Sequence, residues 1–193
     1  KTSPWGEAVT QSVTDEGKAI GTHDPPQEHV FHKLRRPLCK GRRFCKRRQD
    51  TIQEFCPRQL DDVMRLWLEG NLQAHPFVPA SYWRQNADAV RAAIPQARVW
   101  VWVEQDGVVG GFLGLQDGYI AGLFVERRLQ GRGVGTRLLR HVQSLSDTLA
   151  LDVYAANRRA VEFYRAQGFA VSSSCIDPQT GRREYRMCWT AGQ

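Results

Sequence analysis

RVWVWVEQDGVVGGFLGLQDGYIAGLFVE, residues 98–126, contains three apolar runs separated by two Asp-Gly pairs, Asp106-Gly107 and Asp117-Gly118. Branched and aromatic side chains recur in each run, and they favour the extended backbone of a β-strand. An Asp-Gly pair between two such runs is a strong short-range signal for a tight hairpin. The stretch therefore predicts an antiparallel meander of three strands, around which the other elements are arranged.

The segment before the meander has one strand pattern and two helix patterns. A short strand is expected over 51–56. Apolar residues then recur on one face of a helix over 58–70, for which Gly70 is the expected stop signal. A second helix is expected over 81–94, closed by Pro95.

The segment after the meander alternates between helix and strand patterns. Helices are expected from residue 134 and over 157–168, and strands over 148–155, 171–175 and 183–190. The whole order predicts an α/β (α+β) chain with a mixed, mostly antiparallel sheet and flanking helices. Only the strand–helix–strand crossovers of this order can place strands in parallel.

Charge is distributed unevenly along the 193 residues. The chain holds 27 Lys and Arg against 20 Asp and Glu, but residues 1–49 alone hold 11 basic and 5 acidic side chains and all the lysines. Residues 50–193 hold 16 arginines against 15 acids and are close to neutral. This break predicts a basic, disordered N-terminal extension over 1–49 and one globular domain over 50–193.

Residues 33–48, KLRRPLCKGRRFCKRR, concentrate nine of those basic side chains. Patches of this kind bind nucleic acid or anionic surfaces in some proteins. Only Phe31 and Phe44 would supply rings for stacking on bases, so we expect no nucleic-acid partner unless it binds this patch.

Cysteine usage and hydropathy indicate the cellular compartment of the protein. Five cysteines, an odd number without a CxxC pair, favour reduced thiols over a disulfide framework. No apolar run approaches the ~18 residues of a membrane span, and no secretory signal pattern is found. We expect a cytoplasmic protein with no membrane partner. We also expect no metal, because no common zinc spacing occurs.

A glycine-rich turn, QGRGVGT over 130–136, follows the meander and precedes an amphipathic helix. Free N–H groups and the dipole at a helix start favour an anion, which glycines let the backbone approach closely. A Walker A loop is excluded because residues 50–193 hold no lysine, and a dinucleotide GxGxxG because position 136 is threonine. Two interpretations of residues 130–136 remain: a phosphate site of another kind, or a turn in which the glycines serve only the backbone shape.

Two motifs make the chain similar to the GNAT (Gcn5-related) N-acetyltransferases. QGRGVG over 130–135 fits the family's Q/R-x-x-G-x-G/A loop, and NRRAVEFY over 157–164 with Gly168-Phe169 fits its N-x-x-A-x-x-F-Y…G-F helix. The resemblance covers about residues 51–190 and is greatest to small single-domain bacterial members of the YiaC/YjaB kind. It implies the acyl-CoA N-acyltransferase fold, in which strands 4 and 5 are splayed apart.

The resemblance also implies acetyl-CoA as co-substrate. In the family the loop amides hold its pyrophosphate, and the pantetheine arm lies against the fourth strand, where Gly122 suits a β-bulge. The residues that would contact acetyl-CoA are Leu123, Phe124, Val125, Gln130, Gly131, Arg132, Gly133, Val134, Gly135, Thr136, Asn157 and Tyr164.

Two proton transfers accompany the family's direct transfer from thioester to amine. Tyr164 matches the family's acid tyrosine, and a phenol with a pKa of ~10 is protonated at neutral pH and can donate to the departing thiolate. An ammonium with a pKa of ~10.4 must lose a proton before it attacks. The candidates for this base are Glu126, Tyr119 and His75, with Glu162 the weakest, and the sequence does not choose among them.

The predicted function is therefore acetyl transfer from acetyl-CoA to a primary amine, in a protein lysine or an N-terminus, by a monomer or a homodimer. A small-molecule amine acceptor and a non-catalytic acyl-CoA-binding module are the alternatives. A polycation such as an aminoglycoside is disfavoured, because Asp88 is the only acid in the acceptor-side stretch 71–100.

Overall fold

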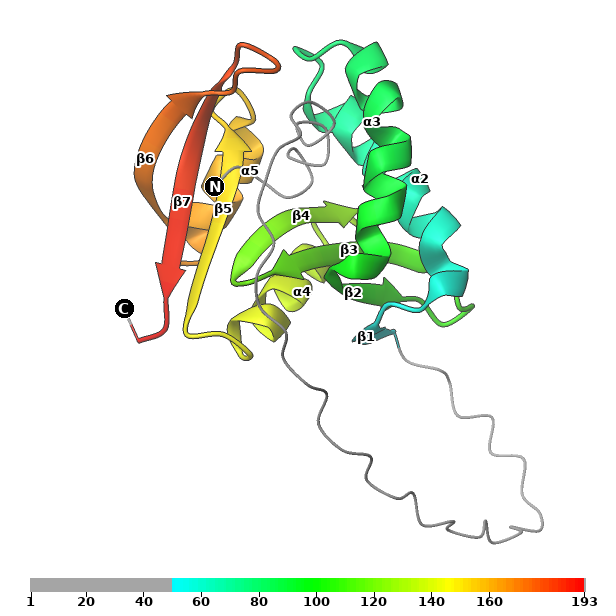
Figure 1. Ribbon diagram of the computed structural model, residues 1–193. Coiled ribbons are helices and arrows are strands. Elements are labelled where there is room, and N and C mark those ends of the chain that lie inside the picture. The colour runs from blue at the N-terminus through cyan, green and yellow to red at the C-terminus, as the bar shows by residue number, and fades with distance from the viewer. Residues whose placement is uncertain (1–49, 193) are drawn as a thin grey trace, which may run out of the picture.

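The structure, a computed structural model, describes residues 50–192. The expected N-terminal extension over 1–49 and its basic patch over 33–48 lie outside the described residues. Within them, seven strands form one sheet in the order β1-β2-β3-β4-β5-β7-β6 (Figure 1). The strands are β1 (Thr51–Glu54), β2 (Arg98–Val103), β3 (Val109–Gln116), β4 (Tyr119–Val125), β5 (Thr148–Tyr154), β6 (Ala170–Ile176) and β7 (Arg183–Thr190).

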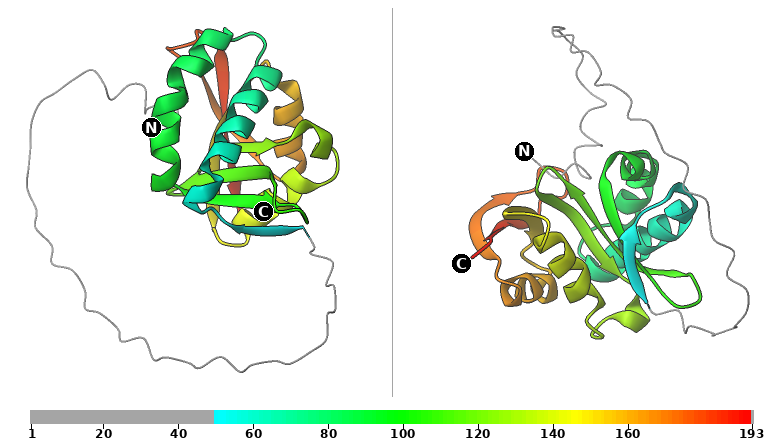
Figure 2. Two further views of the ribbon diagram at one scale, coloured as in Figure 1. Left: turned by 90° about the vertical axis from the view of Figure 1, so that its right-hand side faces the viewer. Right: turned by 90° about the horizontal axis from the view of Figure 1, so that it is seen from below.

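Helices cover both faces of the sheet, as the two views of Figure 2 show. They are α2 (Leu60–Ala74), α3 (Ala80–Ala93), α4 (Val134–Gln143) and α5 (Arg158–Ala166), with short 3-10 turns η1 (Pro57–Gln59), η2 (Ile94–Gln96) and η3 (Arg127–Leu129). None of the helices in the described part of the chain is long and apolar enough to cross a membrane.

Two apolar clusters hold these layers together, because alternate strand residues point to opposite faces of the sheet. Val101 and Phe112 join the cluster beneath α2 and α3. Their neighbours Trp102 and Leu113 face the other way and join the cluster beneath α4 and α5. The order of elements and the mixed sheet expected from the sequence are confirmed.

The antiparallel meander is also confirmed: β2 pairs with β3, and β3 with β4. Both Asp-Gly pairs form the turns, and φ is positive at Gly107, Asp117 and Gly118 (92°, 48° and 77°). Two successive positive φ values at Asp117-Gly118 are what a two-residue hairpin needs to match the twist of its strands.

Gly70 was expected to end the first helix, and this expectation is wrong, because α2 continues through it to Ala74. A Cβ at Gly70 would lie 2.6 Å from Cδ1 of Phe124, a residue of β4. The glycine therefore permits a close approach of α2 to β4 and does not terminate the helix.

Strands β4 and β5 pair in parallel only at Tyr119 and Ala150, and then diverge. Each is held along its length by its other neighbour, β4 by β3 and β5 by β7. One extra residue, Ala121, interrupts the β3–β4 register next to Gly122, as a bulge would. Figure 1 shows β5, β7 and β6 turned away from the meander. The splay of strands 4 and 5 is thus present.

The crossover from β5 through α5 does not place its strands side by side. Strand β7 lies between β5 and β6 and pairs antiparallel with both. Its insertion brings the start of β7 to the end of β5, where Glu184 pairs with Tyr154.

Candidate functional site

The diverging strands open a cleft of about 850 Å³ between α2, β4, β5 and the start of α4. Every residue expected to contact acetyl-CoA lines this cleft, apart from Arg132. Three of the candidates for proton transfer, Tyr164, His75 and Tyr119, line it as well. The sequence motifs, although far apart in the chain, therefore converge on one cavity.

One wall of the cleft is the edge of β4 that faces β5. Beyond Tyr119 this edge has no strand partner in the described structure. Main-chain N–H and C=O groups at such an edge can pair with an extended ligand as a strand would. The cleft therefore offers a linear, hydrogen-bonding surface along Leu123–Val125.

The glycine loop lies at one end of the cleft and leads into α4. Gly131 and Gly133 have φ values of 77° and 82°, and Gly133 is the N-cap of the helix. The first turn of α4 contains no acid, and its amides from Val134 to Thr136 have no acceptor within the helix. The arrangement offers several N–H donors and the positive end of a helix dipole to an anion.

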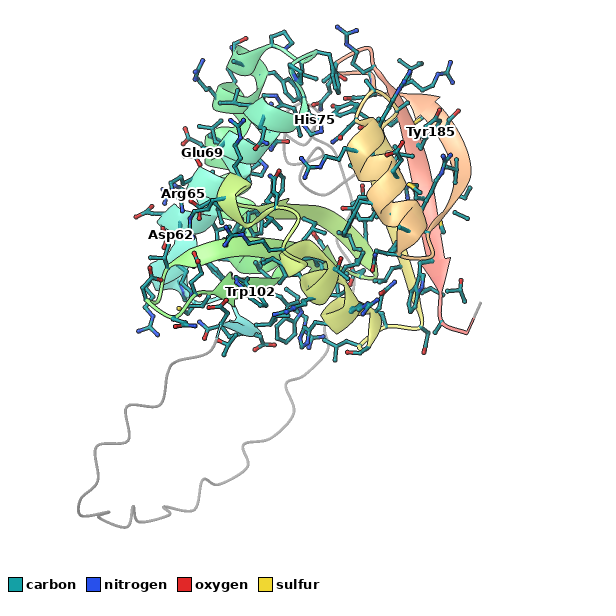
Figure 3. The ribbon with its side chains drawn as sticks, turned by 180° about the vertical axis from the view of Figure 1, so that it is seen from behind. Asp62, Arg65, Glu69, His75, Trp102 and Tyr185 are labelled. Atoms are coloured by element: carbon teal, nitrogen blue, oxygen red, sulfur yellow. The ribbon has the colours of Figure 1, made fainter. Side chains whose placement is uncertain are left out.

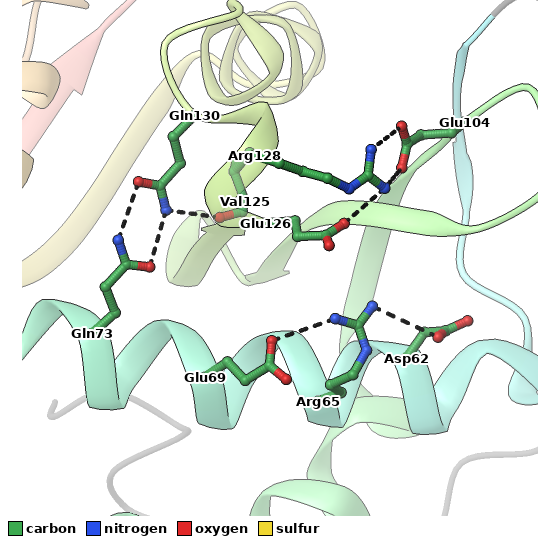
Figure 4. A network of polar contacts seen from close by, with 9 residues as sticks. All are labelled: Asp62, Arg65, Glu69, Gln73, Glu104, Val125, Glu126, Arg128 and Gln130. Carbon is green, nitrogen blue, oxygen red and sulfur yellow. Dashed lines mark hydrogen bonds and ion pairs between the residues drawn. The ribbon is translucent and has the colours of Figure 1, made fainter.

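Gln130 ties this loop to its surroundings (Figure 4). Its side-chain amide donates to the main-chain oxygen of Val125 at 2.9 Å, and its Oε1 accepts from Arg159 at 3.2 Å. It also faces Gln73 of α2 at 3.4 Å. These contacts hold the loop against β4, α2 and α5, so that Gln130 fixes where the N–H donors at the start of α4 lie.

Glu162, the weakest candidate, does not line the cleft, and neither does Glu126. Glu126 forms an ion pair with Arg128 at 3.0 Å, and Arg128 also binds Glu104 (Figure 4). Glu126 lines a smaller neighbouring pocket of about 350 Å³ beneath α2. On that wall of α2, Arg65 pairs with Glu69 at 3.4 Å.

His75 lies at the end of α2, between that helix and α5 (Figure 3). Its Nε2 is 3.3 Å from Nδ2 of Asn157, and its Nδ1 is 3.1 Å from Oδ1 of Asn71. Oδ1 of Asn157 caps α5 by accepting from the N–H of Ala160. Its Nδ2 therefore donates to Nε2 of His75, and the ring proton is assigned to Nδ1.

This neutral form is also the one that burial favours. The His75 ring packs among Phe77, Trp83 and Tyr154 at centroid distances of 5.2 to 5.6 Å. Burial lowers the pKa of His75 to about 4. With both ring nitrogens engaged, His75 fixes the orientation of Asn157.

We expect His75 to make the protein sensitive to acid. The unfolded chain takes up a proton near pH 6.5 that the folded protein excludes until about pH 4, so stability falls as the pH drops through this range. The full shift corresponds to about 3 kcal/mol. Chemical denaturation should therefore show that the free energy of unfolding falls less between pH 7 and pH 4.5 in His75→Gln than in the wild type. Equal losses in both proteins would contradict this assignment.

Tyr164 and Tyr119 occupy different environments. Tyr164 is 8% exposed, packs against Phe163 and Phe169, and has its pKa raised by burial. It therefore remains protonated and able to donate. The hydroxyl of Tyr119 donates to Asp152 at 3.0 Å.

The other end of the cleft is acidic, which the sequence did not reveal. Asp152, Asp177 and Glu184 line it within the described residues, together with Tyr82 and Tyr154. Asp88, the only acid within 71–100, is exposed on α3 and does not line the cleft, and the acids that do line it lie outside that stretch. The three acids belong to β5, β7 and the β6–β7 turn, and the sheet order alone brings them together.

These acids do not form a metal site. No group of three or more His, Cys, Asp or Glu side chains in residues 50–192 is arranged to hold a metal ion. Asp152 instead binds Arg186, whose Nε and Nη2 donate to it at 2.6 and 2.7 Å.

Comparison with known proteins gives consistent matches. Residues 60–169 match the acetyltransferase (GNAT) family. The chain is 36% identical over 144 residues to the peptidyl-lysine N-acetyltransferase YiaC of Escherichia coli K12, which covers 74% of this chain and 98% of the relative. It is 31% identical to the peptidyl-lysine N-acetyltransferase YjaB of the same strain, over 58% of this chain and 76% of the relative.

Solved structures agree with this match. Apo-YjaB from Escherichia coli has a TM-score of 0.66 at 26% identity and covers 72% of this chain and 97% of its own. The PaiA N-acetyltransferase of Thermoplasma acidophilum, solved in complex with coenzyme A, has a TM-score of 0.60 at 13% identity, covering 74% of this chain and 99% of its own. The second likeness supports the fold alone.

Proposed function

The chain belongs to the GNAT family of acetyltransferases, which transfer the acetyl group of acetyl-CoA to an amine, and we propose that it acetylates lysine side chains of proteins. The observation that carries this acceptor class is the 36% identity to a peptidyl-lysine N-acetyltransferase over 98% of that relative's length. The acidic end of the cleft supports it, because an ammonium group is attracted to carboxylates.

The shape of the cleft suits acetyl-CoA. We infer that its pyrophosphate binds the amides of Val134, Gly135 and Thr136, and that Arg132 adds a positive charge beside them. The pantetheine arm would then pair with the free edge of β4, with Asn157 on its other side. This orientation directs the thioester toward Tyr164 and the acidic end.

The reaction then follows from the groups around the thioester. A neutral amine attacks the carbonyl carbon, and an N–H group on the unpaired edge of β4 stabilises the oxyanion. The C–S bond breaks, and Tyr164 donates its proton to the thiolate. The nitrogen loses its second proton, and a proton restores the phenol of Tyr164. Because the amine attacks the thioester directly, no covalent enzyme intermediate is needed.

We propose the cytoplasm as the place of this reaction. In the described residues Cys56, Cys175 and Cys188 are free thiols, as a reducing compartment favours.

The function is tested with an acceptor panel. Purified protein and acetyl-CoA are mixed with lysine peptides whose N-termini are blocked, with peptides that have only a free N-terminus, and with small amines. Free thiol is measured over time, and mass spectrometry locates the acetyl group. The chain's own lysines, all within residues 1–49, are counted separately.

We expect thiol release with the blocked lysine peptides. Release with small amines alone would replace the proposal by a small-molecule acceptor. Binding of acetyl-CoA without release in any mixture would leave an acyl-CoA-binding module.

A further inference from the structure

The three acids at the acceptor end of the cleft differ in their hydrogen-bond and ion-pair partners. Asp152 is ion-paired, because the guanidinium of Arg186 binds both of its oxygens, and the hydroxyl of Tyr119 donates to one of them. Both oxygens of this carboxylate therefore already accept hydrogen bonds from neighbouring side chains.

Asp177 accepts hydrogen bonds from residues in and beside the turn in which it lies. Its Oδ2 accepts from the hydroxyls of Tyr154 at 2.8 Å and Thr180 at 2.6 Å. Its Oδ1 accepts from the N–H of Gln179 at 2.9 Å. This carboxylate shapes the β6–β7 turn.

Glu184 is the exception. It has no hydrogen bond and no ion pair with any residue of the described part of the chain. Because it lies directly opposite Tyr154 in the β5–β7 ladder, the two side chains share the face that looks into the cleft. Glu184 is half-buried there, with room for an acceptor on its free oxygens.

The charges around Glu184 favour a proton on it. Burial and the nearby Asp177 and Asp152 raise the pKa of Glu184 to about 7, while Arg186 acts in the opposite direction. The phenols that face it, Tyr154 on β5 and Tyr82 on α3, carry no charge near neutral pH, because burial raises the pKa of both. On β6, Cys175 lies opposite Glu184.

We propose that Glu184 is the general base of the reaction and that it takes the proton from the acceptor's ammonium group. The carboxylate removes one N–H proton, and the nitrogen lone pair then forms the C–N bond to the thioester carbonyl. Glu184 releases the proton to solvent after the product leaves. This inference rests on the proposed function, because it needs an amine acceptor.

Other candidates fit this role less well. His75 uses both ring nitrogens to hold Asn71 and Asn157, and its low pKa makes it a weak base. Glu126 lines the neighbouring pocket and is paired with Arg128. The hydroxyl of Tyr119 already donates to Asp152.

The test compares Glu184→Gln, Glu184→Asp and the wild type in lysine-peptide acetylation between pH 6 and 10. Glu184→Gln keeps the size of the side chain and removes the base, so kcat/KM at pH 7 should fall at least about 100-fold. Wild-type kcat/KM should rise to a plateau above about pH 7. In Glu184→Gln it should instead rise about tenfold per pH unit toward the amine's own pKa of ~10.4. Glu184→Asp should retain the plateau at a lower rate.

The matched control is Glu54→Gln, which changes an exposed glutamate on β1 away from the cleft and should behave as the wild type. Affinity for acetyl-CoA, measured by calorimetry, and thermal unfolding verify that each variant folds. If the wild type is active and Glu184→Gln keeps both the plateau and the wild-type rate, Glu184 is not the base. The proposed function is not affected by that result. A wild type that acetylates no amine overturns the proposed function, and the base with it.

Discussion

Tyr164→Phe is expected to lower kcat for acetyl transfer by about 10²- to 10⁴-fold and to leave the affinity for acetyl-CoA nearly unchanged. The change removes one oxygen atom and keeps the ring that packs against Phe163 and Phe169. Burial keeps the Tyr164 hydroxyl protonated, so its loss leaves the departing thiolate without this donor. Steady-state kinetics and acetyl-CoA binding by calorimetry separate the two effects.

The matched control is Tyr185→Phe. Tyr185 is partly buried in β7 and packs against the cluster beneath α4 and α5 (Figure 3), and it does not line the cleft. The same atom is removed, so a general loss of stability would affect both variants. If Tyr164→Phe keeps the wild-type kcat, Tyr164 is not the acid.

Gly133→Asp should weaken acetyl-CoA binding by at least about tenfold relative to Gly133→Asn, the second large effect that we expect. Gly133 has a φ of 82°, and both Asp and Asn tolerate this conformation better than other side chains. At this φ either side chain strains the turn at the start of α4, and the strain is nearly the same for both because Asp and Asn have the same shape. The two variants differ in one negative charge at the proposed pyrophosphate site. Repulsion of about 1 kcal/mol or more per phosphate charge follows from Coulomb's law at ~4 Å.

Isothermal calorimetry of acetyl-CoA at low and high salt measures this effect. The gap between the two variants should narrow at high salt, because ions screen exposed charges. Equal affinities at low salt would mean that the loop does not hold the pyrophosphate, and that its glycines serve only the turn.

Local features of the chain were predicted well from the sequence. The Asp-Gly turns depend on φ values that glycine and aspartate themselves favour, so the meander follows from residues 98–126. Helix α5 begins at Arg158, directly after its N-cap Asn157, because the cap bonds a main-chain N–H only three residues away. Gly70 is where such local reasoning failed, since its role depends on Phe124 in a distant strand.

The sequence by itself therefore determined the order of elements, the family, and the loop and helix whose motifs line the cleft, because each of these depends on residues close together in the chain. Only the tertiary structure decided how the acceptor end is built. Asp152 and Glu184 are separated by more than thirty residues and meet because β7 inserts beside β5. Packing between other distant elements joins His75 to Asn157 and places Glu126 in the neighbouring pocket. Charge and proton affinity at these positions arise from burial and from neighbours across the sheet, which no short stretch of sequence contains.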